Sequence, residues 1–85
     1  VIGKAAALLC LYSNVRMLYA DVLSEAALVL LNGFGIDVSY SMLVPYIKDR
    51  RGRGKCPMEK LSSDTDSPEE MYRRVEEFLE NQPED

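Results

Sequence analysis

The hydrophobic pattern in the first half of the chain predicts apolar helices between strands. Residues 4–13 are apolar on every side, which for a helix indicates burial. Asn14 is a suitable end for that helix. Residues 15–23 are apolar with little alternation, as in a parallel strand covered on both faces. Residues 36–40 alternate between apolar and polar, and predict a strand with one exposed face.

A second helix is predicted between these two strands. The hydroxyl of Ser24 can cap its first turn, and Glu25 is favourable beside the positive end of the helix dipole. We expect the helix to end at residues 32–33, Asn-Gly, in a left-handed conformation. Residues 1–2 have the character of a strand end before a glycine turn. The order is then strand, helix, strand, helix, strand, which predicts a parallel sheet with right-handed crossovers.

The last predicted helix has the clearest start signal. Ser67 is the expected N-cap, Pro68 stands at the first helical position, and Glu70 completes a capping box. One face of this helix is apolar and carries Met71, Val75, Phe78 and Leu79. Before it, residues 41–66 sustain no hydrophobic period, although the apolar side chains at 43–47 can extend or cover the sheet.

The length of 85 residues predicts one small α/β domain over residues 1–80 with a polar tail at 81–85. No apolar run approaches the roughly 20 residues that span a bilayer, so we expect no membrane association. Cys10 falls in an apolar helix and Cys56 in a charged loop, which is not the disulfide framework of a secreted protein. We therefore expect a cytoplasmic protein with reduced thiols.

The chain begins at a strand–helix junction, so we expect an upstream segment to be missing. A sheet shortened in this way exposes an edge, and we expect the domain to associate either with that segment or with itself as a homo-oligomer.

Charge is distributed unevenly behind the net value of −4. Residues 45–60 carry six cations and two acids, whereas residues 61–85 carry nine acids and two arginines. A basic segment beside an acidic helix indicates either an anionic ligand or internal pairing, and the acidic total favours internal pairing. Tyr46 is the only aromatic residue near the basic run, so we do not expect nucleic-acid binding.

Cys56 is a candidate nucleophile. The neighbouring Lys55 favours the thiolate, which is the reactive form of the side chain. Glu59 and Glu25 are the acids best placed by sequence to move protons. The alternative is a small, half-buried cysteine before a turn proline. The chain contains no histidine, the commonest general base and metal ligand, so we expect no metal site and no cofactor.

Gly3 and Lys4 form a second candidate site at the start of the first helix. The free N–H groups of a helix start together with an ammonium suit a phosphate or a carboxylate. Ser24 and Glu25 stand at the equivalent junction of the next unit, and ligands of open α/β sheets collect beyond the carboxyl ends of the strands. The alternatives are a solvated lysine and simple helix capping.

Four ordered blocks carry a family resemblance. They are residues 1–7 (VIGKAAA), 19–28 (YADVLSEAAL), 43–47 (LVPYI) and 56–60 (CPMEK). Together they resemble a small prokaryotic family of unknown function with a cytidine-deaminase-like fold. The resemblance implies a three-layer α-β-α sandwich, here without its N-terminal helix and β-hairpin.

In zinc deaminases, a His or Cys ligand and a catalytic Glu open the first of these helices, and two cysteines open the next. This chain has Gly3, Lys4 and Ala5 at the first position and residues 24–28, Ser-Glu-Ala-Ala-Leu, at the second. The resemblance therefore implies a zinc-less cleft that binds a small anionic or nucleotide-like ligand. A thiol enzyme using Cys56 and an interaction module without chemistry are the alternatives.

Overall fold

The computed structural model describes residues 1–48, 54 and 57–81 of the chain. These residues form four helices and two strands. In chain order they are α1 (Lys4–Tyr12), β1 (Met17–Ser24), α2 (Glu25–Gly33), β2 (Asp37–Val44), α3 (Pro57–Ser62) and α4 (Pro68–Glu80). The predicted alternation of helices and strands is confirmed, and β2 is longer than expected because it continues to Val44.

The sheet is parallel, as predicted from the order of elements. Met17 lies opposite Asp37, and the same register continues to the end of both strands. Ile2 forms a parallel bridge with Leu23 on the other side of β1. Its backbone N–H donates to the carbonyl of Val22 at 2.8 Å, so Ile2 pairs with β1 as a strand residue does, in agreement with the extended conformation predicted there. The junctions that follow Ile2 and β1 therefore lie side by side.

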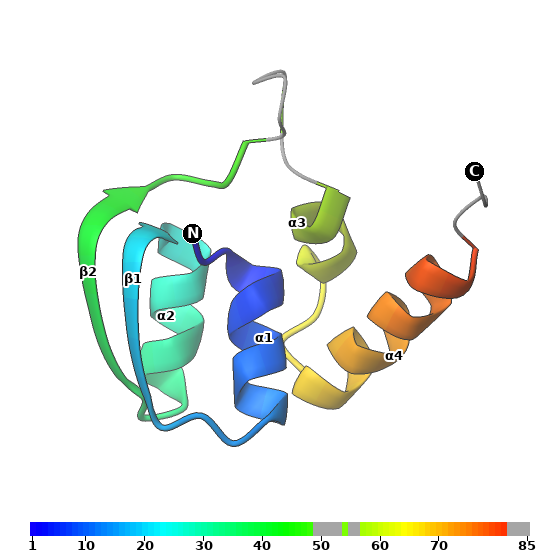
Figure 1. Cartoon of the computed structure of the whole chain (residues 1–85), viewed down its shortest axis with the longest axis horizontal. Coiled ribbons are helices and arrows are strands. Elements are labelled where there is room, and N and C mark those ends of the chain that lie inside the picture. The colour runs from blue at the N-terminus through cyan, green and yellow to red at the C-terminus, as the bar shows by residue number, and fades with distance from the viewer. Residues whose placement is uncertain (49–53, 55–56, 82–85) are drawn as a thin grey trace.

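Helices α1 and α2 cover one face of the sheet, and α3 and α4 pack against α1 on the side away from it (Figure 1). The apolar core lies between these layers. Its buried members are Ala5, Ala7, Leu8, Ala20, Leu23, Ala27, Leu30, Leu31 and Met71. Met17 and Tyr19 of β1 are exposed. The prediction that this strand is covered on both faces is therefore wrong for the described part of the chain, because the covering helices all lie on one side.

Local capping signals are largely confirmed. Asn14 follows α1 with a φ of 64°, the left-handed conformation that ends a helix. The Ser67 hydroxyl accepts from the Glu70 N–H at 3.2 Å, as an N-cap does. The capping box is only half formed, because the Glu70 carboxylate binds arginines of its own helix instead of returning to the Ser67 N–H. The left-handed glycine after α2 is Gly35 rather than Gly33.

The short helix α3 was not predicted. Six residues span less than two turns, so no hydrophobic period can develop in the sequence. Its buried residues, Glu59 and Ser62, are polar, so their burial depends on contacts with other elements. On α4 the predicted apolar face is narrower than expected, since Met71 is buried whereas Leu79 is exposed.

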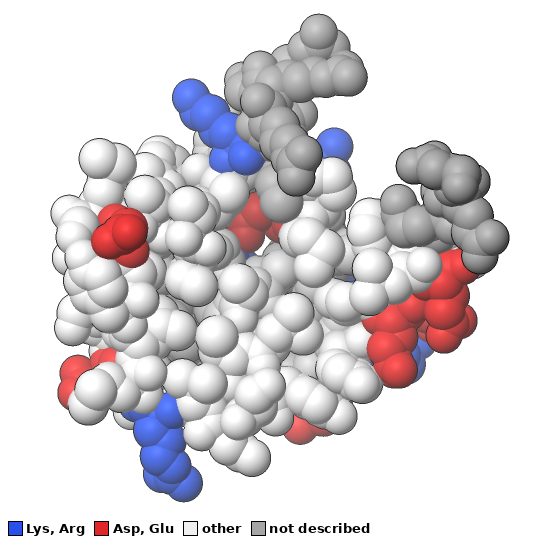
Figure 2. Space-filling view, viewed as in Figure 1, with Lys and Arg blue, Asp and Glu red and all other residues white. Residues whose placement is uncertain are grey.

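Charged side chains are unevenly distributed over the face shown in Figure 2, with isolated ones over the strands. Acidic side chains gather over α4, and the part of this face over the sheet, α1 and α2 is largely uncharged (Figure 2). Within the described residues, no helix has the length and apolar character needed to cross a membrane.

Candidate functional site

The amino end of α1 is held by a carboxylate from α3. The N-cap residue, Gly3, has no side chain that can accept a hydrogen bond from the first turn. Instead, the backbone N–H of Lys4 donates to Glu59 Oε1 at 2.8 Å. Glu59 is 7% exposed, and its carboxylate lies where the helix dipole favours negative charge. The helix start predicted to bind an anion therefore already carries one, and a ligand there would have to replace Glu59.

Gly3 is required by this close approach. A Cβ at this position would lie 2.3 Å from Glu59 Oε1 and 3.0 Å from Ile47 Cγ1. The backbone of Gly3, with φ −99° and ψ −176°, is extended and open to any residue type. Space rather than backbone conformation therefore demands glycine. The contact also brings Ile47, from the segment after β2, against the start of α1.

The ammonium of Lys4 also has an internal partner. Its Nζ lies 2.9 Å from Asp66 Oδ1, where the Lys4 side chain is 15% exposed and that of Asp66 is 77% exposed. This pair borders a hollow of about 450 Å³ whose other wall is formed by α2 and Phe34. The remaining lining residues are Ala26, Val29, Leu30, Gly33 and Phe34. The side chain of Lys4 thus runs toward the loop before α4.

Ser24 caps α2, as the sequence predicts. Its buried hydroxyl accepts from the Ala27 N–H at 3.1 Å. Its own backbone N–H donates to the Ile2 carbonyl at 2.9 Å, which joins the two junctions. Glu25 begins the helix and is exposed. Capping accounts for both residues, and neither lines the hollow beside Lys4 and Asp66.

A second hollow lies where three chain segments leave the sheet. We call it the junction hollow; its volume is about 540 Å³. It is lined by Val1, Val22, Val44, Pro45, Tyr46, Ile47 and Lys48. The walls are mainly apolar, and Tyr46 and Lys48 add a phenol and an ammonium. It adjoins the predicted site, because Val1 and Val22 come just before the two helix junctions and Ile47 lies against Gly3.

The predicted thiol site falls partly outside the described residues. Cys56 and Lys55 are not among the residues that the structure describes, so their roles remain predictions. Glu59, their predicted proton carrier, is buried against the start of α1. The other cysteine, Cys10, is half-buried, and this burial raises the pKa of its thiol. Because a raised pKa disfavours the thiolate, this burial makes the Cys10 thiol less reactive than a fully exposed one.

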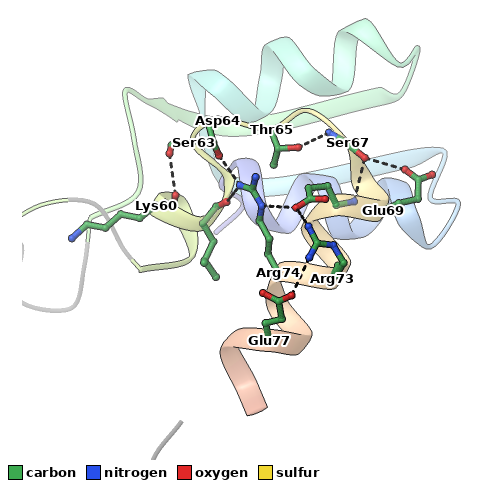
Figure 3. A network of polar contacts seen from close by, with 11 residues as sticks. Lys60, Ser63, Asp64, Thr65, Ser67, Glu69, Arg73, Arg74 and Glu77 are labelled. Carbon is green, nitrogen blue, oxygen red and sulfur yellow. Dashed lines mark hydrogen bonds and ion pairs between the residues drawn. The ribbon is translucent and has the colours of Figure 1, made fainter. Parts of the chain in front are cut away.

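The loop between α3 and α4 is fastened by Arg74 (Figure 3). Its guanidinium donates to the Leu61 carbonyl at 2.7 Å, to Asp64 Oδ1 at 2.6 Å and to Glu70 Oε2 at 3.0 Å. Arg73 contacts the same Glu70 carboxylate. Together with the pair between Lys4 and Asp66, these contacts tie the loop to both α1 and α4. Among the described residues, the acids of this loop and of the first turn of α4 pair with Lys4, Arg73 and Arg74. Most of the basic run at 48–55 lies outside the described residues.

The comparisons with known proteins identify the family. The family model described as a domain of unknown function, DUF1893 (TM1506), matches residues 1–79. This chain belongs to the DUF1893 family. A crystal structure of the DUF1893 protein TM1506 from Thermotoga maritima is 38% identical with a TM-score of 0.85. The match covers 91% of this chain and 52% of TM1506, so this chain spans about half the length of that relative. Comparison with curated proteins finds no match.

Among the described residues of this DUF1893 domain, no three Cys, Asp or Glu side chains come together as metal ligands. The residues that line the junction hollow come from separate segments, so no pattern within one segment predicts it. The one available signal was the apolar run 43–47 leading directly into the basic run at Lys48. That sequence places apolar walls and a cation next to each other at a strand end.

The loop contacts predict a pH dependence of stability. Hydrogen bonds from Arg74 lower the pKa of Asp64, and those from Arg73 and Arg74 lower the pKa of Glu70. A carboxyl whose pKa is lower in the folded state stabilises that state above its unfolded pKa and loses the effect as pH falls through the folded pKa. We therefore expect the free energy of unfolding to decrease as pH falls from about 5 through the carboxyl range.

Urea unfolding at several pH values and low salt measures this effect. Arg74→Ala is expected to flatten the decrease. Arg16→Ala, which removes an exposed arginine that forms no ion pair in the described part of the chain, is expected to leave it unchanged. Equal slopes for Arg74→Ala and the unmodified protein would contradict the assignment.

Proposed function

We propose that this DUF1893 domain binds a small anionic or nucleotide-like ligand in the junction hollow. The observation that carries the proposal is the position of this hollow at the carboxyl ends of β1 and β2. Open parallel sheets bind ligands beyond these strand ends. A volume of about 540 Å³ falls within the usual range for small-molecule sites.

The lining indicates the class of ligand. Val22, Val44 and Ile47 supply apolar walls suited to a flat or aliphatic group. The ring of Tyr46 offers a face for stacking, and the ammonium of Lys48 offers a charge for a phosphate or a carboxylate. A molecule with an apolar or aromatic body and one anionic group matches this arrangement better than a fully polar metabolite does.

The cytidine-deaminase-like architecture is part of the same proposal. It is supported by parallel strands that are each followed by a helix, with the two helix starts adjacent to each other. The zinc chemistry of that fold does not fit the residues present. Gly3–Lys4 and Ser24–Glu25 offer no histidine or thiolate at the two junctions. We therefore propose a zinc-less binding domain and derive no deamination step.

A binding experiment with matched lysine variants tests the proposal. Inorganic phosphate and a panel of nucleoside monophosphates are titrated into the protein by calorimetry. Lys48→Ala is expected to weaken binding of any nucleotide that binds by about tenfold or more, the usual loss for a charge-assisted hydrogen bond. Lys60→Ala removes an exposed cation of α3 outside the hollow and is the control.

The location of the site is decided by a second pair of variants. Lys4→Ala is expected to change binding little, because its ammonium is paired with Asp66. Loss of binding in Lys4→Ala but not in Lys48→Ala would place the ligand at the α1 start instead. Absence of binding across the whole panel would contradict the proposed function.

A further inference from the structure

The outer edge of β2 is unpaired within the part of the chain that the structure describes. One edge of this strand forms the parallel ladder with β1, from Asp37 to Val44. No backbone hydrogen bond joins its other edge to any residue that the structure describes. Alternate N–H and C=O groups of an eight-residue strand therefore face outward. Such a row of groups is a template for another extended strand.

The edge also lacks the features that usually prevent strand pairing. Natural edge strands are interrupted by lysine, proline, inward-pointing charge or short length. The sequence of β2 contains neither lysine nor proline, and its single charge, Asp37, stands at its first position. Three exposed apolar side chains, Tyr40, Met42 and Leu43, lie along the rest of it. An edge of this length with a single charge at one end is expected to be covered in solution.

We infer that β2 pairs with β2 of a second copy of this chain in the antiparallel direction. The position of the charge selects this arrangement. Parallel pairing in register would place the two Asp37 carboxylates next to each other, and like charges directly opposite are destabilising. Antiparallel pairing about an axis near Tyr40 and Ser41 places each Asp37 beside the partner strand's uncharged end. The two carboxylates are then roughly 20 Å apart, given about 3.3 Å per residue.

A second copy fits this edge because the strand is its own complement in that direction. With this axis, residues 38–43 of one molecule lie opposite residues 38–43 of the other, and Val44 lies opposite Asp37. The result is one continuous sheet with the helices of each copy on its own half. The pairing also gives Met42, which is 57% exposed, a neighbouring strand to contact. The test at Met42 is independent of the proposed ligand, because Met42, unlike Val44 at the end of the same strand, does not line the junction hollow.

Size-exclusion chromatography with light scattering over a range of concentrations tests the inference. The unmodified protein is expected to approach twice its chain mass of 9.6 kDa. Met42→Lys places a charge on the edge and is expected to weaken the dimer by about tenfold or more, which shifts the mass toward the monomer. Val29→Lys also replaces an exposed apolar side chain with lysine, at a position of α2 that is 73% exposed. It is expected to leave the dimer intact.

Circular dichroism of each variant separates loss of pairing from loss of folding. If Met42→Lys is unfolded, Ser39→Lys adds a charge at another exposed position of the same strand. A monomeric unmodified protein at the highest attainable concentration overturns the inference. A dimer that persists in a folded edge-lysine variant overturns it as well, because the interface would then lie elsewhere.

Discussion

Replacement of Met71 by alanine is expected to lower the free energy of unfolding by about 2–5 kcal/mol, the usual cost of emptying a buried methionine site. Met71 is 0% exposed and is the one residue of α4 that belongs to the buried core. Domains of this size are stable by roughly 5–15 kcal/mol, so the change removes a large share of the total. Urea unfolding followed by circular dichroism measures it.

The matched control lies on the same helix. Leu79 is 65% exposed, and Leu79→Ala also deletes a large apolar side chain from α4. Its expected effect is within about 0.5 kcal/mol, because little surface leaves water at that position on folding. Similar losses for both variants would mean that helix propensity, rather than the contact of α4 with the core, determines the result.

Gly3→Ala is expected to destabilise the domain by about 1–3 kcal/mol, the typical cost of overpacking. The added Cβ would lie 2.3 Å from Glu59 Oε1 and 2.9 Å from its Cδ, so the Glu59 side chain must move. Its hydrogen bond to the Lys4 N–H is then strained or lost. Thermal and urea unfolding measure the change. Gly33→Ala is the control, because a Cβ there meets no atom within 4 Å.

A double-mutant cycle identifies Glu59 as the cause. Glu59→Ala alone is expected to cost about 0.5–2 kcal/mol through loss of the helix cap. In the Glu59→Ala background, Gly3→Ala is expected to cost clearly less than in the unmodified protein, because the clashing carboxylate is absent. Full additivity of the two changes would show that Ile47 or the backbone, rather than Glu59, limits the space at residue 3.

The contact between Glu59 and α1 links the junction hollow to α3. Ile47 lines the hollow and lies against Gly3, and Gly3 in turn lies against Glu59. A ligand that displaces Ile47 would therefore change the same close contacts around residue 3 that Gly3→Ala changes. This arrangement explains how the hollow at the strand ends and a cap from a distant helix occupy neighbouring space without sharing side chains.

Local interactions made much of the secondary structure predictable. The caps of Ser24 and Ser67 and the turn at Asn14 join groups within a few positions of one another. The apolar stretches predicted both strands, because burial imposes a periodicity that is visible in a short window. The helix α3 was missed because six residues are too few for such a pattern. Its start at Pro57 became recognisable only in the folded chain.

The sequence by itself determined the order of α1, β1, α2, β2 and α4 and the serine caps of α2 and α4, because these follow from interactions between near neighbours in the chain. The parallel direction of the strands follows from that order, since a helix connects them. The tertiary structure decided the surroundings of the site. Glu59 reaches Lys4 across 55 positions, and the Lys4 side chain pairs with Asp66 in the loop before α4. The junction hollow likewise combines residues from the start of the chain, β1 and the segment after β2. Such contacts depend on how whole elements pack against one another, and no pattern within one segment records them.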